Sequence, residues 1–143
     1  MSQVSEELII AWLRLSAMME KRTLVSGLSF NEAMVCNLIH RGCCTAGALC
    51  EQTKILKSQM NAILSSLEKR GIITRTPSPT DRRKVEIRFL DEGYALYRRS
   101  HEHTIALLDR LVEEVGEADM RAVIPVLQRA AATFDEFSTE VTP

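Results

Sequence analysis

Apolar side chains recur at helical spacing along most of the 143-residue chain, and capping residues indicate where individual helices begin. The pattern predicts a first helix from Ser5 to Arg22, with Ser5 as its N-cap. Ser29, followed three residues later by Glu32, forms the sequence pattern of a capping box and predicts the start of a second helix. Thr45 is the predicted N-cap of a short third helix.

The second half of the chain predicts three more helices and one pair of strands. A fourth helix is expected from about 57 to 70, and the last two cover about 91–115 and 118–137, where Pro125 should kink the chain or fray the first turns. Segments 72–76 and 85–89 alternate with the period of two that is typical of strands. Because prolines between them exclude a helix, they predict a β-hairpin with a long tip.

This order predicts a fold that is mainly α with a small β-hairpin wing (α+β), a winged helix-turn-helix flanked by N- and C-terminal dimerisation helices. We expect one domain over 1–143, with the winged helix-turn-helix at 29–90 and dimerisation helices at 1–28 and 91–143. The outer helices carry more apolar residues than one small core needs, which favours packing against a second copy over a closed monomeric bundle. The residues concerned are Val112, Val115, Val123, Ile124, Leu127 and Phe134.

Charge is distributed very unevenly along the chain. The stretch from Lys54 to Arg88 carries nine basic and three acidic residues, a balance of +6, whereas the whole chain sums to −1 and the remainder therefore to −7. Such a split indicates that a polyanion docks on one part of the molecule only. A helix followed by a basic, proline-stiffened turn is a suitable device for reading DNA.

The candidate DNA-binding residues lie in this basic stretch. Small or polar side chains on the outer face of the fourth helix could approach base edges, while cations at its start and in the hairpin could meet phosphates or a minor groove. Asp81 is expected to pair with an arginine and hold the tip in one shape. The full set is Lys54, Lys57, Ser58, Gln59, Asn61, Ala62, Ser65, Arg75, Asp81, Arg82, Arg83 and Lys84.

Three segments, 67–75 (LEKRGIITR), 79–84 (PTDRRK) and 89–93 (FLDEG), resemble the multiple antibiotic resistance regulator (MarR) family of winged-helix repressors. The resemblance extends over almost the whole chain. It implies a homodimer that binds a pseudo-palindromic operator and is released by a small molecule, a metal or an oxidant, in a bacterial or archaeal cytoplasm. By position, Lys57, Ser58, Asn61 and Ala62 match groove-contacting residues, and Asp81 with Arg83 matches the Asp-x-Arg wing. Leu56 replaces the usual Ser or Thr N-cap, so the fourth helix is expected to start from Thr53 or Ser58 instead.

The resemblance also implies an effector, and several residues are candidates for sensing it. Trp12, Met18, Met34 and Tyr97 could line a pocket for a small aromatic inducer, although they could equally be plain core. His101 matches one ligand of zinc-responsive relatives, but the other histidines of that site are absent and no metal site is predicted. Cys43, Cys44 and Cys50 could sense oxidants, or be ordinary buried thiols.

Other functional classes lack support in the sequence. We find no secretory signal, no apolar run of the roughly 20 residues that cross a bilayer, and no glycine-rich loop or catalytic triad pattern, so neither membrane binding, a cofactor nor enzymatic activity is expected. The alternative is a winged-helix module that binds a protein partner without specific DNA binding. A thiol switch that also binds DNA is a third interpretation.

Overall fold

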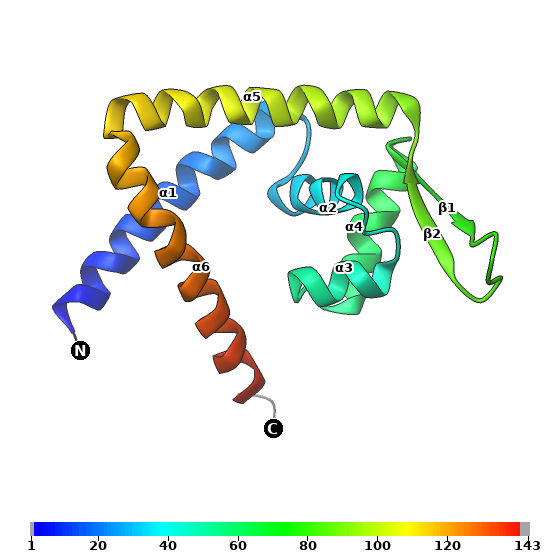
Figure 1. The fold of residues 1–143 in the computed structure, drawn as a ribbon, viewed down its shortest axis with the longest axis horizontal. Helices are drawn as coiled ribbons and strands as arrows, with labels where there is room; N and C mark the ends of the chain where they lie inside the picture. The colour runs from blue at the N-terminus through cyan, green and yellow to red at the C-terminus, as the bar shows by residue number, and fades with distance from the viewer. Residues whose placement is uncertain (1, 141–143) are drawn as a thin grey trace. The chain divides into compact units, whose positions relative to one another are not determined.

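The computed structural model describes residues 2–140, with side chains for all of them except residues 22–26 and 138–140. The chain forms two compact units, one ending at His101 and the other starting at Glu102, and α5 contributes to both. Figure 1 shows the elements in order: α1 (Gln3–Ser26), α2 (Phe30–His40), α3 (Ala46–Thr53), α4 (Lys57–Lys69), β1 (Ile73–Pro77), β2 (Val85–Phe89), α5 (Asp91–Val115) and α6 (Glu117–Glu140).

Two of the three predicted N-caps are confirmed. The Ser29 hydroxyl accepts a hydrogen bond from the Glu32 N–H at 3.1 Å, and the Glu32 carboxylate accepts one from the Ser29 N–H at 2.8 Å, which is a complete capping box. Thr45 caps α3 by accepting from the Ala48 N–H at 3.2 Å. These local bonds explain why α2 and α3 begin where the sequence predicts.

Both predicted ends of the first helix are wrong. Helix α1 starts one turn earlier than expected, with Ser2 at the N-cap position, so Ser5 lies inside it and caps nothing. It continues to Ser26 because Gly27 adopts the left-handed conformation that ends a helix (φ 82°). Helix α6 is helical from Glu117 through Pro125, so the predicted fraying of its first turns does not occur.

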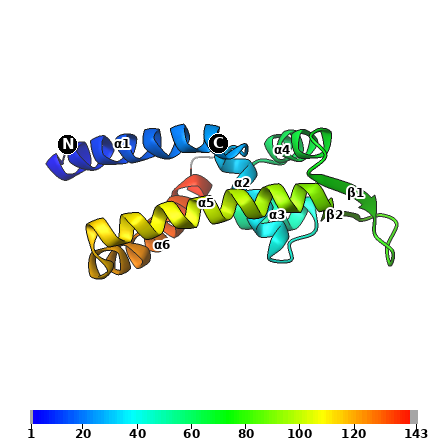
Figure 2. The ribbon, with the colours of Figure 1, turned by 90° about the horizontal axis from the view of Figure 1, so that it is seen from above.

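The buried core lies in the first unit, beneath α2, α3, α4 and the hairpin. It is formed by side chains from the inner faces of these elements, by two residues of the connections before α2 and β1 and by one tyrosine of α5. These residues are Leu28, Val35, Cys36, Ile39, Leu49, Met60, Leu64, Leu67, Ile72, Ile73, Ile87 and Tyr97. The hairpin pairs Ile73 with Phe89 and Pro77 with Val85, and its base is anchored where the Ile87 N–H donates to the Cys44 carbonyl at 2.7 Å. The tip extends beyond the helices (Figures 1 and 2).

Candidate nucleic-acid interface

Helix α4 has one buried face and one exposed face. Met60, Leu64 and Leu67 are completely buried, and they recur at the spacing of one helical side. The opposite side is exposed and carries the residues that the sequence singled out, Lys57, Ser58, Gln59, Asn61, Ala62 and Ser65. The packing of α4 therefore leaves a complete small and polar edge accessible, as a helix that enters a DNA groove requires.

The start of α4 lacks a side-chain cap. The helix begins at Lys57 with Leu56 at the N-cap, and the expected shift to Thr53 or Ser58 does not occur. Thr53 belongs to α3, where its hydroxyl donates to the Leu49 carbonyl at 2.7 Å and accepts from the Ile55 N–H at 3.2 Å. Because the Leu56 side chain offers no hydrogen-bond acceptor, the first N–H groups of α4 are suited to a phosphate, with Lys57 beside them.

Backbone hydrogen bonds shape the hairpin tip. The Asp81 carboxylate accepts from the backbone N–H of Arg83 at 3.0 Å, and the Asp81 carbonyl accepts from the Lys84 N–H at 3.0 Å. The buried Ser78 then closes the loop, since its N–H donates to the Lys84 carbonyl at 2.8 Å. The expected pairing of Asp81 with a guanidinium is not among the ion pairs of the described residues. The tip is thus ordered without using its cations, and Arg82, Arg83 and Lys84 stay exposed.

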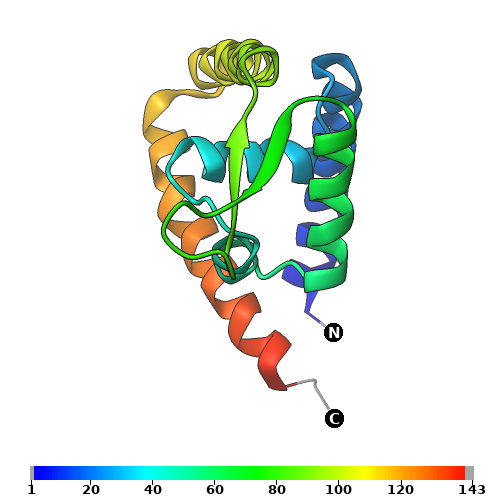
Figure 3. The same cartoon turned by 90° about the vertical axis from the view of Figure 1, so that its right-hand side faces the viewer.

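The nine cations of the basic stretch fall into different groups. Three arginines form ion pairs with glutamates: Arg70 with Glu32 at 3.1 Å, Arg75 with Glu68 at 3.2 Å and Arg88 with Glu86 at 3.0 Å. Five others are exposed and form no ion pair in the part of the chain that the structure describes, and these are Lys57, Lys69, Arg82, Arg83 and Lys84. Two of them lie on α4 and three at the hairpin tip; Figure 3 views the molecule from the hairpin side, with α4 at the right and the tip toward the left. Lys54, at the end of α3, is exposed with a left-handed backbone (φ 60°).

Arg75, a predicted DNA contact, is engaged within the protein. Its guanidinium donates to both carboxylate oxygens of Glu68, at 3.3 and 3.2 Å, and to the Ser65 hydroxyl at 3.2 Å. The hydrogen bonds from Arg75 lower the pKa of Glu68. Arg75 therefore links β1 to α4. Its guanidinium also hydrogen-bonds the hydroxyl of Ser65, which is another predicted DNA contact.

A second ion pair joins Arg70 to the buried carboxylate of Glu32. This carboxylate also accepts hydrogen bonds from the Ser29 N–H and the Ser66 hydroxyl. Burial acts to raise the pKa of Glu32, but the Ser29 N–H and the Arg70 charge outweigh it, so the pKa lies below its usual value of 4.5. A carboxylate whose pKa is lower in the folded state stabilises the fold at neutral pH. That stability is lost as the pH falls through the folded-state pKa.

We expect the free energy of unfolding to decrease as the pH falls from about 5 to about 3, and Glu32→Gln to remove part of that decrease. Urea unfolding at a series of pH values measures this. The matched control is Glu113→Gln, which changes an exposed carboxylate of α5 and should keep the wild-type dependence. Identical pH profiles for Glu32→Gln and wild type would contradict the prediction.

The predicted effector residues are brought together only in part. Tyr97 is buried, its hydroxyl accepts from the Asn37 amide at 2.9 Å, and its ring lies 5.7 Å from that of His101. Met34 is partly buried, whereas Trp12 and Met18 of α1 are 52% and 59% exposed. Among the described residues no group of three metal-ligating side chains occurs.

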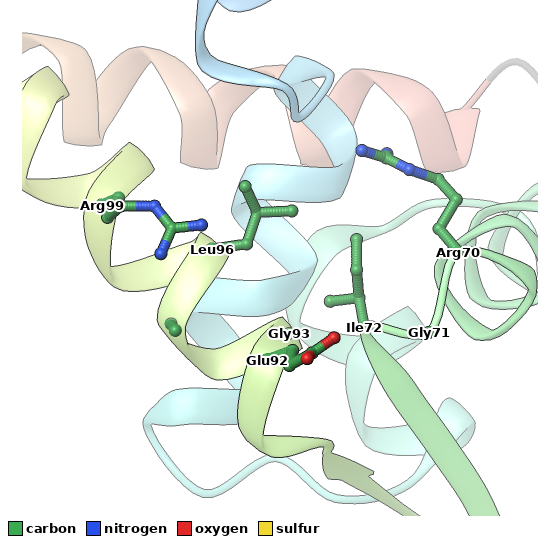
Figure 4. Close-up of a pocket in the computed structure, with 8 residues that line it drawn as sticks. Arg70, Gly71, Ile72, Glu92, Gly93, Leu96 and Arg99 are labelled. Atoms are coloured by element: carbon green, nitrogen blue, oxygen red, sulfur yellow. The ribbon is translucent and has the colours of Figure 1, made fainter.

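A hollow of about 420 Å³ lies elsewhere, between the connection from α4 to β1 and the first turns of α5. None of the predicted effector residues lines it. No local sequence pattern indicates this hollow, because its wall brings residues 70–72 together with residues 92–99. Figure 4 shows the lining residues, Arg70, Gly71, Ile72, Glu92, Gly93, Ala95, Leu96 and Arg99.

The cysteines differ in accessibility. Cys44 is exposed, while Cys43 and Cys50 are partly buried against the core. Cys36, which the sequence did not single out, is fully buried, and burial raises its pKa to about 12. Because the thiolate is the reactive form, Cys36 is a structural thiol.

Helix α3, the connection, α4 and the hairpin, in this order and with the outer edge of α4 exposed, define a winged helix-turn-helix protein. The sequence model of the MarR family matches residues 26–84. The resemblance to this family and the predicted fold class are both confirmed.

Individual relatives support the assignment. The HTH-type transcriptional regulator FarR of Neisseria gonorrhoeae is 29% identical over 91 residues, which cover 64% of this chain and 62% of that regulator. A solved structure of the transcriptional repressor CouR bound to a 23-mer DNA duplex is 27% identical, with a TM-score of 0.80 over 92% of this chain and 96% of that one. BpsR of Bordetella bronchiseptica has the same fold at 22% identity, with a TM-score of 0.75 over 91% and 94% of the two chains.

Among the described residues, no helix combines the length and apolar content that a membrane span requires.

Proposed function

We propose that the protein is a sequence-specific double-stranded DNA-binding transcriptional regulator that acts as a repressor. The observation that carries the proposal is the exposed edge of α4, lined by Ser58, Asn61 and Ala62 and accompanied by five exposed cations that form no ion pair among the described residues. Side chains on that edge are suited to base edges, and the cations to the phosphates beside the groove. The similarity to CouR, whose structure contains a DNA duplex, supports the same assignment.

We propose further that the protein works as a homodimer on a pseudo-palindromic operator. Apolar side chains on α1, α5 and α6 remain exposed in the single chain, including Trp12 (52%), Ile124 (54%) and Phe134 (64%). Exposed apolar surface of this extent favours a partner that covers it, and a second copy would set two α4 helices about one DNA turn apart, roughly 34–36 Å. In this arrangement residues 29–90 bind DNA, and 1–28 with 91–143 form the dimer.

An inducer that weakens DNA binding belongs to the same proposal. The structure of BpsR concerns the regulation of its DNA binding by 6-hydroxynicotinic acid, and a small molecule, a metal or an oxidant could act here in the same sense. The candidates on this chain are the Tyr97 and His101 pair and the exposed Cys44. A regulator of this kind works where the chromosome lies, in the cytoplasm of a bacterium or archaeon.

The first experiment is to select bound fragments from genomic DNA and to titrate the chosen duplex by fluorescence anisotropy at several salt concentrations. We expect tight binding to the selected duplex and weaker, strongly salt-dependent binding to random duplex. A winged-helix module that binds only a protein partner would bind neither, so the absence of salt-dependent duplex binding would overturn the proposal.

Asn61→Ala is expected to cost about 1–3 kcal/mol of binding free energy per half-site on the selected duplex and much less on random duplex, because an amide on the exposed edge of α4 can hydrogen-bond a base edge. Gln52→Ala, at an exposed amide of α3 outside the α4 edge, is the matched control and should leave both affinities near wild type. Equal losses on the two duplexes in the anisotropy titration would mean that Asn61 contacts only the DNA backbone.

A further inference from the structure

One guanidinium meets the ends of three helices. Arg70 is the C-cap of α4, and its Nη1 donates to both carboxylate oxygens of Glu32, at 3.2 and 3.1 Å. Its Nη2 donates to the backbone carbonyl of Gly27, the residue that ends α1. Since Glu32 belongs to the capping box of α2, this single side chain joins the end of α1, the start of α2 and the end of α4.

The contact has little freedom to rearrange. Glu32 is only 8% exposed, and it also accepts hydrogen bonds from the Ser29 N–H and, at 3.4 Å, from the Ser66 hydroxyl of α4. A buried carboxylate that loses its cation is destabilised, because the interior cannot replace the solvation that water provided. Arg70 is 39% exposed, yet it could reach a phosphate only by leaving Glu32 without its partner.

Arg70 therefore differs from the cations around it. It lies in the basic stretch, directly after the exposed edge of α4, and the sequence alone would group it with Lys57 and Arg83. In the structure its side chain extends away from the strand that follows, as Figure 4 shows, toward the junction of α1 and α2. Its charge is compensated inside the protein, whereas those of Lys57 and Arg83 face solvent.

We propose that Arg70 is a positioning residue for DNA recognition, which holds the C-terminal end of α4 against the junction of α1 and α2 and contacts no phosphate. The inference rests on the proposed function, since it concerns how α4 is presented to DNA. It makes the ends of α1 and α2 part of the machinery that sets the orientation of the reading helix. Substituting Glu32, which is buried, should then weaken operator binding as substituting Arg70 does.

The test compares Arg70→Met, Glu32→Gln and the double variant with wild type, using anisotropy titrations of the selected duplex and of a random duplex at four salt concentrations. Arg83→Gln, which removes an exposed cation, is the matched control for loss of charge. Urea unfolding of each variant fixes a temperature at which all are folded, so that a lower folded fraction cannot imitate weaker binding.

We expect Arg70→Met and Glu32→Gln each to lower the affinity for the selected duplex by about tenfold and that for random duplex by less than about twofold. The double variant should be little worse than either single one, because both substitutions remove the same ion pair. The dependence of log K on log salt should keep its wild-type slope in all three. Arg83→Gln should instead weaken binding to both duplexes and reduce the slope by about 0.9 per protomer.

Three results would overturn the inference. A reduced salt slope in Arg70→Met would show that Arg70 contacts a phosphate. Unchanged affinity for the selected duplex, or equal losses on both duplexes, would show that Arg70 does not orient α4. If the wild-type protein does not bind duplex DNA, both the proposed function and this inference are wrong. If the wild-type protein and Arg70→Met bind the selected duplex equally well, only the inference is wrong.

Discussion

Gly93→Ala is expected to lower the free energy of unfolding by about 3 kcal/mol or more, the largest stability effect of any single substitution that we predict. Gly93 lies in the first turn of α5 and is buried against Ile72. A Cβ atom at this position would lie 2.5 Å from the Ile72 carbonyl carbon and still closer to its oxygen and Cα. All three are backbone atoms, so no side-chain rotation can relieve the clash.

The neighbouring backbone has no room to shift. The Ile72 N–H donates to the Leu67 carbonyl at 2.9 Å, and the Ile72 carbonyl accepts from the Leu90 N–H at 3.0 Å. Moving Ile72 would break one of these bonds and expose a side chain that is 2% exposed. The substitution should therefore separate α5 from the base of the hairpin, and urea unfolding followed by circular dichroism measures the effect.

Gly47→Ala is the matched control for Gly93→Ala. Gly47 lies in α3, its Cβ would meet nothing within 4 Å, and its φ is not positive. Alanine there should leave stability unchanged or raise it by about 0.5–1 kcal/mol, because glycine is the weaker helix former. A Gly93→Ala protein with a wild-type unfolding midpoint would contradict the close packing of α5 on Ile72.

The sequence predicts best those features that depend on neighbouring residues. The capping box of Ser29 and Glu32, the Thr45 cap and the buried stripe of α4 each follow from residues no more than four positions apart, or from the repetition of that spacing. The start of α1 was predicted wrongly because a helical period indicates which face is buried and gives little information about where a helix begins.

Contacts between distant residues explain most of what the sequence did not predict. Glu32 and Arg70 are 38 positions apart, and nothing in either local pattern indicates that they pair. Arg75 and Glu68 are only seven apart, but their contact depends on how β1 folds back on α4. As a result the sequence overestimated the number of cations available to DNA. The exposed edge of α4 was correctly located, since it is the complement of the buried stripe.

Arg83→Ala is expected to weaken binding to duplex DNA by on the order of 10- to 100-fold at moderate salt and to leave the dimer intact. The Arg83 side chain is exposed at the hairpin tip and forms no ion pair among the described residues, while its backbone N–H holds the tip through Asp81. Alanine keeps that N–H, so the tip should retain its shape and lose only the charge. For a dimer that loses one phosphate contact per protomer, the slope of log K against log salt should decrease by about 1.8.

Arg121→Ala provides the control for the loss of an arginine elsewhere. Arg121 is an exposed residue of α6, paired with Glu117 at 2.7 Å, and it belongs to the other compact unit. Removing it changes the net charge by the same amount, so it should leave the salt slope unchanged if local phosphate contacts, and not overall charge, determine binding. Anisotropy titrations give the slopes and sedimentation gives the oligomeric state. Equal effects of Arg83→Ala and Arg121→Ala on the salt slope would mean that the wing lies outside the DNA interface and that its cations are only solvated surface charges.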